Sequence, residues 1–236
     1  MNLKLLSWNV RSLNVLEKWL QIHNLLRTWR SDIVCLLETK LEWITRGIVQ
    51  SIWSCPYIDR LYLGFEGAFG SILLMWDWRV VEEVEEVVGH FSVSCRFKNV
   101  GDQFEWAFIG AYGPYLNRKC QKMWEELTGL ISWWNLPWCL GSDFNVICFS
   151  SERLGAVSYT QSMYDFSDFI SIHGLMDTPL EGGRYPWSNS SSASRIDQFL
   201  FLLTILNYLE FAEIGRQVWL SLWSWLMGYF IGCKYF

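Results

Sequence analysis

The chain has 236 residues, of which 51% are hydrophobic and 18% charged, so it can bury a sizeable core. Its formal net charge is −5, with 24 acidic against 19 basic side chains. This balance argues against tight, sequence-independent binding of nucleic acid, because phosphate contacts come from Lys and Arg. It does not exclude an enzyme whose metal site needs clustered carboxylates. Seven Cys at irregular spacing predict buried, reduced thiols and no disulfide framework.

The first elements in chain order form a β-α-β pattern. Residues 4–9 alternate as a strand that ends at the polar Asn9, and residues 33–37 form a short apolar run followed by Glu38. Between them, residues 15–29 carry apolar side chains at three- and four-residue steps, which is typical of a helix. A helix between two such runs predicts a β-α-β opening.

From residue 57 to residue 112 the pattern changes to short strands separated by turns. Four strands are predicted here, at residues 71–76, 80–88, 91–97 and 105–112. Strands that follow one another without an intervening helix favour antiparallel pairing.

The second half adds helices and further strands. We predict helices at residues 120–134 and 160–173, a strand that runs from residue 138 to Asp143, and strands at residues 184–187 and 195–201. Residues 188–194 are rich in Ser and predict a surface loop. The fold class is therefore α/β, with two mixed sheets packed face to face and helices outside.

Predicted strands repeatedly end in polar side chains. These side chains belong to Asn9, Glu38, Tyr112, Asp143 with Asn145, and Asp197. Strand ends that gather at one edge of packed sheets bring such groups together, and carboxylates there suit a hard cation such as Mg²⁺. Each residue alone is a weak signal, because a polar residue after a strand is more often a turn former or a helix cap. Their order along the chain carries the weight.

Five segments in this order resemble the endonuclease/exonuclease/phosphatase superfamily, which includes DNase I-like nucleases, abasic-site endonucleases, inositol phosphatases and sphingomyelinases. The segments are Ser7-Trp8-Asn9-Val10-Arg11-Ser12-Leu13-Asn14, Leu37-Glu38-Thr39-Lys40, Ala111-Tyr112-Gly113-Pro114-Tyr115, Gly141-Ser142-Asp143-Phe144-Asn145 and Ser194-Arg195-Ile196-Asp197. The first and the last are most similar to endonuclease domains of non-LTR (LINE) retrotransposons, particularly those of plant genomes. The resemblance implies a DNase I-like, four-layer α/β/β/α sandwich over residues 1–201.

The resemblance also implies a metal and a reaction. Glu38 would be the principal ligand of Mg²⁺ (or Mn²⁺), with Asn9 beside it on the metal or on the phosphate. Asp143 would orient or deprotonate the attacking water, or protonate the leaving oxygen. Phosphodiester hydrolysis needs such a set: an electrophilic cation, a positioned water and donors for the developing charge.

Three further roles follow from the same resemblance. Asn145 would hold the scissile phosphate, and Tyr112 would reach that phosphate through its hydroxyl. Asp197 would orient a catalytic His. The implied partner is DNA, and the implied activity is that of an endonuclease. The sequence does not indicate an oligomeric state.

The sequence departs from the family pattern near its end. The family closes with a Ser-Asp-His tripeptide, whereas His23, His90 and His173 of this chain all precede Asp197. A smaller departure is Ser12, which stands where the family pattern has Gly. The missing tripeptide predicts a degenerate site with little or no activity, as in a pseudoenzyme.

Residues 202–236 are Trp-rich and stop resembling the family, so we expect the last strands of the fold to be missing there. Within this tail, residues 218–233 form an uncharged run, shorter than the roughly 20 residues that span a bilayer. No signal peptide opens the chain, which favours an intracellular location, nuclear or cytoplasmic. Two alternatives to the endonuclease stay open: a phosphoinositide or sphingomyelin phosphodiesterase of the same superfamily, and a non-catalytic remnant that associates with membranes or partners.

Overall fold

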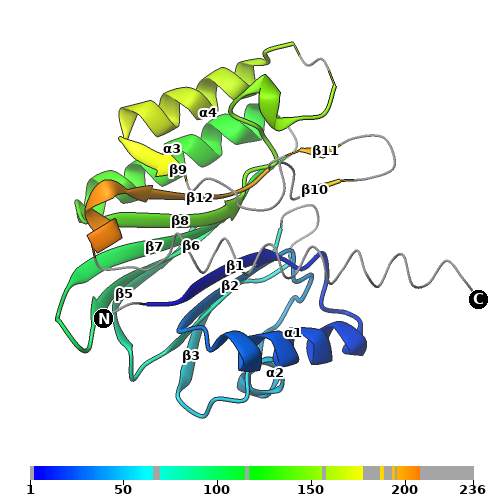
Figure 1. Cartoon of the computed structure of the whole chain (residues 1–236), viewed down its shortest axis with the longest axis vertical. Coiled ribbons are helices and arrows are strands. Elements are labelled where there is room, and N and C mark those ends of the chain that lie inside the picture. Colours follow the sequence, from blue (N-terminus) through cyan, green and yellow to red (C-terminus); the bar gives the residue numbers. More distant parts are fainter. Residues whose placement is uncertain are drawn as a thin grey trace, which may run out of the picture.

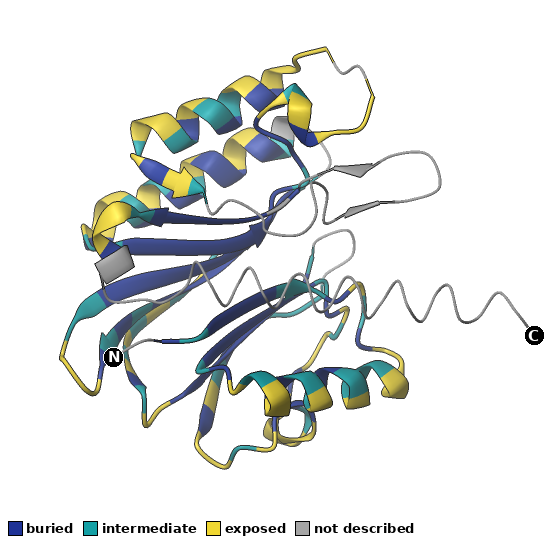
Figure 2. Cartoon of the chain, in the orientation of Figure 1, coloured by how far each residue is buried: buried dark blue, intermediate teal, exposed yellow. Residues whose placement is uncertain are grey.

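A computed structural model describes residues 3–65, 70–114, 117–155, 158–177, 187–188, 193–194 and 196–207. Two β-sheets pack face to face, and a pair of helices covers the outer side of each sheet (Figure 1). The strands are largely buried, while the helices alternate buried and exposed positions (Figure 2). The four-layer α/β/β/α sandwich predicted from the sequence is confirmed.

The first sheet has four strands in the order β1-β2-β4-β3. Their bounds are Leu5–Asn9 for β1, Ile33–Leu37 for β2, Ile58–Leu63 for β3 and Ile72–Asp77 for β4. β1 and β2 are parallel, as the β-α-β opening predicted, and β4 is antiparallel to both β2 and β3. Helices α1 (Leu16–Trp29) and α2 (Arg46–Ile52) bury their apolar faces on the outer side of this sheet.

The second sheet has six strands in the order β5-β6-β7-β8-β12-β9. Their bounds are Val81–Val88 for β5, Ser92–Asn99 for β6, Glu105–Tyr112 for β7, Trp138–Asp143 for β8, Leu175–Asp177 for β9 and Asp197–Leu202 for β12. β7 and β8 are parallel, and the other neighbours are antiparallel. Helices α3 (Asn117–Trp134) and α4 (Gln161–Ile172) cover the outer side.

Short elements complete the description. A small hairpin pairs β10 (Trp187–Ser188) with β11 (Ala193–Ser194), so Ser188, Ala193 and Ser194, which were predicted as parts of a loop, belong to strands. Two 3₁₀ turns follow β8 and β12, η1 at Ser150–Glu152 and η2 at Leu203–Asn207.

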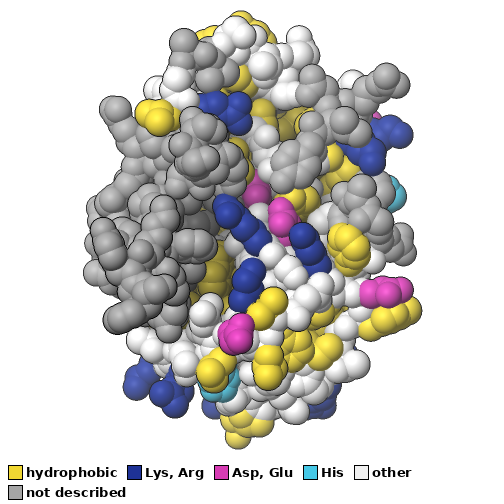
Figure 3. All heavy atoms as spheres, turned by 90° about the vertical axis from the view of Figure 1, so that its right-hand side faces the viewer, with side chains coloured by type: hydrophobic (Ala, Val, Ile, Leu, Met, Phe, Trp, Pro, Cys, Tyr) yellow, Lys and Arg dark blue, Asp and Glu magenta, His cyan; other side chains and the backbone are white. Residues whose placement is uncertain are grey.

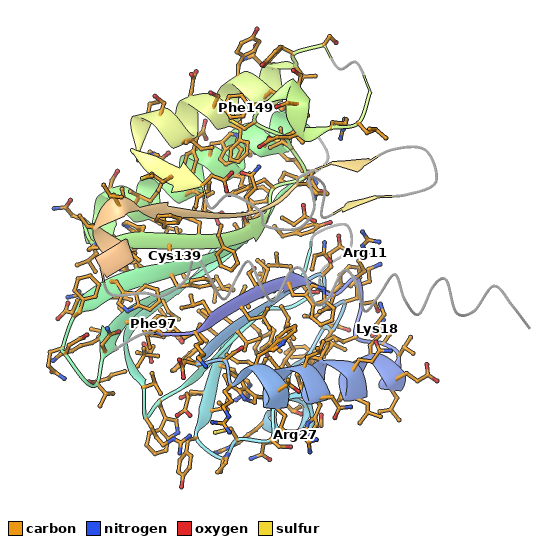
Figure 4. All side chains as sticks on the ribbon, viewed as in Figure 1. Arg11, Lys18, Arg27, Phe97, Cys139 and Phe149 are labelled. Carbon is orange, nitrogen blue, oxygen red and sulfur yellow. The ribbon has the colours of Figure 1, made fainter. Side chains whose placement is uncertain are left out.

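The layer between the sheets is apolar and tightly packed. Cys35 of the first sheet lies in one cluster with Phe97 and Cys139 of the second, which Figure 4 labels. Gly141 of β8 marks a close approach, because a Cβ there would lie 2.8 Å from the Cβ of Ser7. The sheets therefore sit at a fixed separation, and residues at their ends are held against one another.

Most of the predicted elements are present within one or two residues of their predicted ends. The described elements that were not predicted are α2, β3, β9 and β11, together with the turns η1 and η2. The predicted strand at residues 184–187 falls mostly outside the described residues. So do residues 208–236, which include most of the tail and the run 218–233.

Two further expectations concern cysteines and membranes. The six described cysteines are free thiols, and five of them are buried, as predicted. Helices in the described ranges are too short or too polar to cross a membrane.

Candidate active site at the strand ends

The two parallel strand pairs bring their ends to one edge of the molecule. Asn9 ends β1 opposite the last residue of β2, and Glu38 comes directly after β2. In the second sheet Tyr112 pairs with Asp143, and Asp143 also pairs with Asp197 at the start of the antiparallel β12. The predicted strand ends therefore meet at the right-hand side of Figure 1. The side chain of Asp197 is outside the described set.

A hydrogen bond joins the two sheets across this edge. The Nδ2 of Asn9 donates to Oδ2 of Asp143 at 2.7 Å. The orientation of the Asn9 amide is set by its other end, since Oδ1 accepts from the backbone N–H of Arg11 at 2.9 Å. The first sheet thereby positions the carboxylate of the second.

A second bond between the sheets involves the other predicted carboxylate. The hydroxyl of Tyr112 donates to Oε1 of Glu38. Gly70, just before β4, permits this placement, because a Cβ at Gly70 would collide with the Tyr112 ring. Glu38 is half-buried and keeps its second oxygen outside this bond.

Asn145 lies in the turn after β8, and both its backbone and its side chain are fixed by hydrogen bonds. Its backbone N–H donates to Oδ1 of Asp143 at 3.0 Å, and its Nδ2 donates to the carbonyl of Gly113 at 2.6 Å. The Gly113 N–H in turn donates to the Asp143 carbonyl at 2.7 Å. The turns after β7 and β8 thus form one hydrogen-bonded unit around Asp143.

Left-handed backbone is concentrated at this edge. Eight described non-glycine residues have positive φ, and five of them lie in the turns after β1, β2 and β8. They are Arg11 (50°), Ser12 (101°), Glu38 (54°), Lys40 (56°) and Asn145 (54°). Such conformations cost free energy and persist where the surrounding structure holds them, which is common at active sites.

Backbone hydrogen bonds hold the first two of these turns together. The N–H of Ser12 donates to the Glu38 carbonyl at 2.6 Å, and the N–H of Leu13 donates to the Thr39 carbonyl at 2.7 Å. Thr39 is itself fully buried and bonds Ser71 through its hydroxyl at 2.9 Å. The turns that carry Asn9 and Glu38 therefore act as one structure.

Burial dominates the electrostatics of Asp143. Its side chain is almost completely buried, and this desolvation raises its pKa to about 6. This value already includes the hydrogen bonds from Asn9 and Asn145, which lower the pKa, the Glu38 charge, which raises it, and the Arg11 charge, which lowers it. A carboxylate with this pKa is ionised at neutral pH yet basic enough to accept a proton.

Lys18 lies within electrostatic range of Glu38, Arg11 and Lys40, and it was not singled out from the sequence. Burial lowers the pKa of Lys18, and repulsion from Arg11 and Lys40 lowers it further, against the attraction of Glu38. The Nζ of Lys18 donates to the carbonyls of Val10 and Arg11 at 3.1 and 3.3 Å. Figure 4 shows Arg11 and Lys18 at the same end of the molecule, and Figure 3 faces this end, where Lys and Arg side chains gather around acidic ones.

Lys18 could have been noticed in the sequence. It lies in the first turn of α1, where the helix dipole favours acidic side chains and disfavours cations. A cation at such a position has a partner or a ligand elsewhere, here the carbonyls of the turn after β1.

The donors near Glu38 fit a small hard cation. A Mg²⁺ ion is commonly held by one or two carboxylates plus waters and substrate oxygens. Glu38 and the amide oxygen of Asn9 are oxygen donors of the kind that such a partial shell would use, on the edge where the Glu38 charge also acts on Asp143. Groups of three or more His, Cys, Asp or Glu side chains that could enclose a metal do not occur among the described residues.

Two of the three histidines lie away from this edge, whereas His90 lies at the same end of the second sheet as Tyr112, whose N–H donates to the carbonyl of Phe91 at 3.0 Å. His23 is within α1 beside Ser54, and His173 caps α4 and contacts Thr128 at 3.0 Å. His90 lies at the turn before β6.

No family model and no curated protein matches the sequence. Solved structures do match its fold. The AP endonuclease LMAP of Leishmania major matches with a TM-score of 0.65 at 15% identity, over 87% of this chain and 80% of that one. The endonuclease domain of TRAS1, a telomere-specific non-LTR retrotransposon, matches with a TM-score of 0.63 at 13% identity, over 87% of each chain.

A third similar structure is an endonuclease/exonuclease/phosphatase family protein of Bacteroides thetaiotaomicron, with a TM-score of 0.61 at 18% identity, over 86% of this chain and 84% of that one. The chain therefore has the fold of the endonuclease/exonuclease/phosphatase proteins, to which its ordered strand-end motifs had pointed.

Proposed function

We propose that this protein is a Mg²⁺-dependent phosphodiesterase that nicks DNA, at a rate lowered by the lack of a histidine partner for Asp197. One observation carries the proposal. The buried Asp143, with its pKa raised to about 6, is bonded to Asn9 at 2.7 Å on the edge where Glu38 also lies. A basic group is thus held beside a carboxylate able to bind a cation.

Each side chain has a chemical role in this proposal. Glu38 and Asn9 would hold Mg²⁺ (or Mn²⁺), which supplies Lewis-acid stabilisation of charge on the phosphate. Asp143 accepts a proton from the attacking water, and Asn9 keeps its carboxylate in place. Asn145 has a second Nδ2 hydrogen to donate to a phosphate oxygen, and Tyr112 would donate to one when its hydroxyl leaves Glu38. Asp197 starts β12 opposite Asp143, close enough along the sheet to belong to the same set.

Support for DNA as the substrate comes from two sources. Two of the similar structures are named as an AP endonuclease and a retrotransposon endonuclease domain. In addition, Arg11, Lys18 and Lys40 provide positive charge next to Glu38, although the chain as a whole is acidic. A polyanion would relieve the mutual repulsion of these cations.

The proposed low rate has a separate basis. The sequence has no His after Asp197, where the family pattern places its Ser-Asp-His tripeptide. Loss of a general acid or base typically lowers a rate by about 10²–10⁴-fold. We therefore expect slow turnover that still depends on Glu38.

Nicking of supercoiled plasmid by the purified protein tests the proposal. We expect slow nicking in Mg²⁺, none in EDTA, and none from a Glu38→Ala variant. Glu42→Ala is the matched control, because Glu42 is an exposed carboxylate in the same segment. Nicking that survives EDTA or Glu38→Ala would overturn the proposal, and a folded protein without any activity would support the non-catalytic alternative.

A further inference from the structure

Trp43 is an exposed indole on a well-anchored loop between β2 and α2. Its side chain is 72% exposed, whereas the next residue, Ile44, is buried. The loop is fixed before Trp43 by the N–H of Phe65, which donates to the Leu41 carbonyl at 3.0 Å. It is fixed after Trp43 by Thr45, whose hydroxyl caps α2. The large apolar side chain of Trp43 is therefore exposed to solvent, while the backbone on either side of it is fixed by hydrogen bonds.

The loop lies at the same edge as the candidate site. β2 and β3 are both antiparallel to β4, so their ends point the same way, and a Cβ at Gly64 after β3 would meet the Glu42 carbonyl at 2.6 Å. Trp43 follows Glu38 by five residues, a reach of at most about 17 Å for extended chain. That reach corresponds to roughly five nucleotides of a DNA strand.

Trp43 lies near a cation along the chain, and an exposed carboxylate, Glu42, directly precedes it. Lys40 lies three residues before Trp43, and its charge acts on Lys18 together with that of Arg11. A track of positive charge with an aromatic side chain beside it is the arrangement that binds single-stranded nucleic acid, because phosphates follow the cations and a base stacks on the ring.

The other two strongly exposed described tryptophans lack this setting. Trp78 follows β4 at the opposite end of the first sheet and contacts Tyr57 edge-on at 5.2 Å. Trp133 is near the end of α3, the end that leads into the start of β8 and hence lies away from the site. Trp43 alone among these three shares an edge with the cations.

We propose that Trp43 stacks on an unpaired base of a DNA strand whose phosphates lie on Arg11, Lys18 and Lys40. The inference rests on the proposed function and adds a substrate preference to it. Bases inside a duplex have both faces covered by their neighbours, so an indole can stack only on a base that is unpaired or displaced. The protein should therefore favour single-stranded or locally unpaired DNA.

Binding in EDTA tests this inference without requiring turnover. Fluorescence anisotropy would compare a labelled oligothymidylate with an oligomer of equal phosphate number whose sugars carry no bases. Trp43→Ala should weaken binding of oligothymidylate by about 5- to 100-fold and leave the base-free oligomer unaffected. Trp43→Phe should retain most of the affinity, and Trp133→Ala should change neither.

Lys40→Ala serves as a second comparison, since it should weaken both oligomers alike. An equal loss for both oligomers in Trp43→Ala would overturn the stacking proposal in favour of a packing effect. No loss for either would also overturn it and would direct attention to a protein partner for this surface.

Plasmid nicking separates this inference from the proposed function. Glu38-dependent nicking together with an unaltered Trp43→Ala variant would leave the hydrolase standing and remove the stacking role. Absence of nicking together with base-dependent binding through Trp43 would do the reverse.

Discussion

The two sheets contribute to the candidate site in different ways. In the second sheet, Tyr112 and Asp143 are the last residues of regular buried strands, and their positions follow from strand register. In the first sheet, Glu38 lies in a left-handed turn after its strand, and the turn is held by hydrogen bonds to Ser12 and Ser71.

The two sheets therefore set different properties of the site: the pKa of one carboxylate and the accessibility of the other. Burial in the second sheet shifts the pKa of Asp143, which is nearly inaccessible to solvent. Strained turns in the first sheet instead place Glu38 near Lys18 and leave it half-exposed, as the proposed binding of a metal ion and a phosphate requires. Chemistry that depends on basicity should thus be sensitive to changes in the second sheet, and ligand binding to changes in the first.

The largest expected effect is on turnover in the second sheet. Asp143→Asn removes the proposed base and should lower Mg²⁺-dependent nicking by about 10²–10⁴-fold. For the protein with Asp143 the nicking rate should also fall as the pH drops below about 6, where this carboxyl takes up a proton. Nicking assays over a pH series measure both effects. A variant with the original rate would remove Asp143 from the reaction.

The second effect concerns the contact between the sheets. Gly141→Ala places a Cβ 2.8 Å from the Ser7 Cβ and 3.0 Å from the ring of Phe108, so the sheets must separate. We expect the free energy of unfolding to fall by about 1–3 kcal/mol in urea titrations. Gly129→Ala is the control, because a Cβ there meets nothing within 4 Å in helix α3. It should stabilise the protein by about 0.5–1 kcal/mol, and a similar loss from both changes would contradict the close approach.

The third effect is a pH dependence of stability. The pKa of Asp143 is about 6 in the fold against an ordinary value of 3.8 for an exposed aspartate, so the folded state binds the extra proton between these values. The contribution of Asp143 to stability is therefore fully present below about pH 3.8 and is lost as the pH rises through about 6. The difference in unfolding free energy between the protein and Asp143→Asn should shift by on the order of 3 kcal/mol over this window. A constant difference would show that Asp143 titrates at its ordinary value.

The arrangement of the site was predictable from sequence because it depends on strand order. Asn9, Glu38 and Asp143 each end an apolar run, and two parallel pairs bring such ends to one edge. The elements that escaped prediction are short: α2 has 7 residues and β9 has 3, too few to show a period. β3 places charged Asp59 and Arg60 side by side, which hides its alternation.

Features that depend on backbone angles were not predictable. Arg, Ser and Glu rarely adopt positive φ. The sequence therefore did not predict the left-handed turns at Arg11, Ser12 and Glu38. The bond from Asn9 to Asp143 spans 134 positions and requires both sheets to be in place. The role of Asp197 and the boundary of the domain after residue 201 stay predictions.

The smallest expected effect returns to the first sheet, at Ser12. Its φ of 101° suits glycine, which the family pattern has at this position, so Ser12→Gly should relieve strain. Two losses oppose the gain: the Ser12 hydroxyl accepts from the N–H of Asn14 at 3.1 Å, and glycine adds freedom to the unfolded chain. We expect a net stabilisation of about 0.5–1 kcal/mol in urea titrations.

Arg30→Gly is the matched control for Ser12→Gly, because Arg30 has a φ of 53° at the C-cap of α1 and lies away from the site. Both changes should stabilise the protein, but only Ser12→Gly should alter the nicking rate, since it relaxes a turn whose N–H bonds the Glu38 carbonyl. If Ser12→Gly destabilises the protein while Arg30→Gly does not, the bond to Asn14 outweighs the strain. The serine would then hold the turn in place of the glycine, and the first sheet would have kept its geometry through a different interaction.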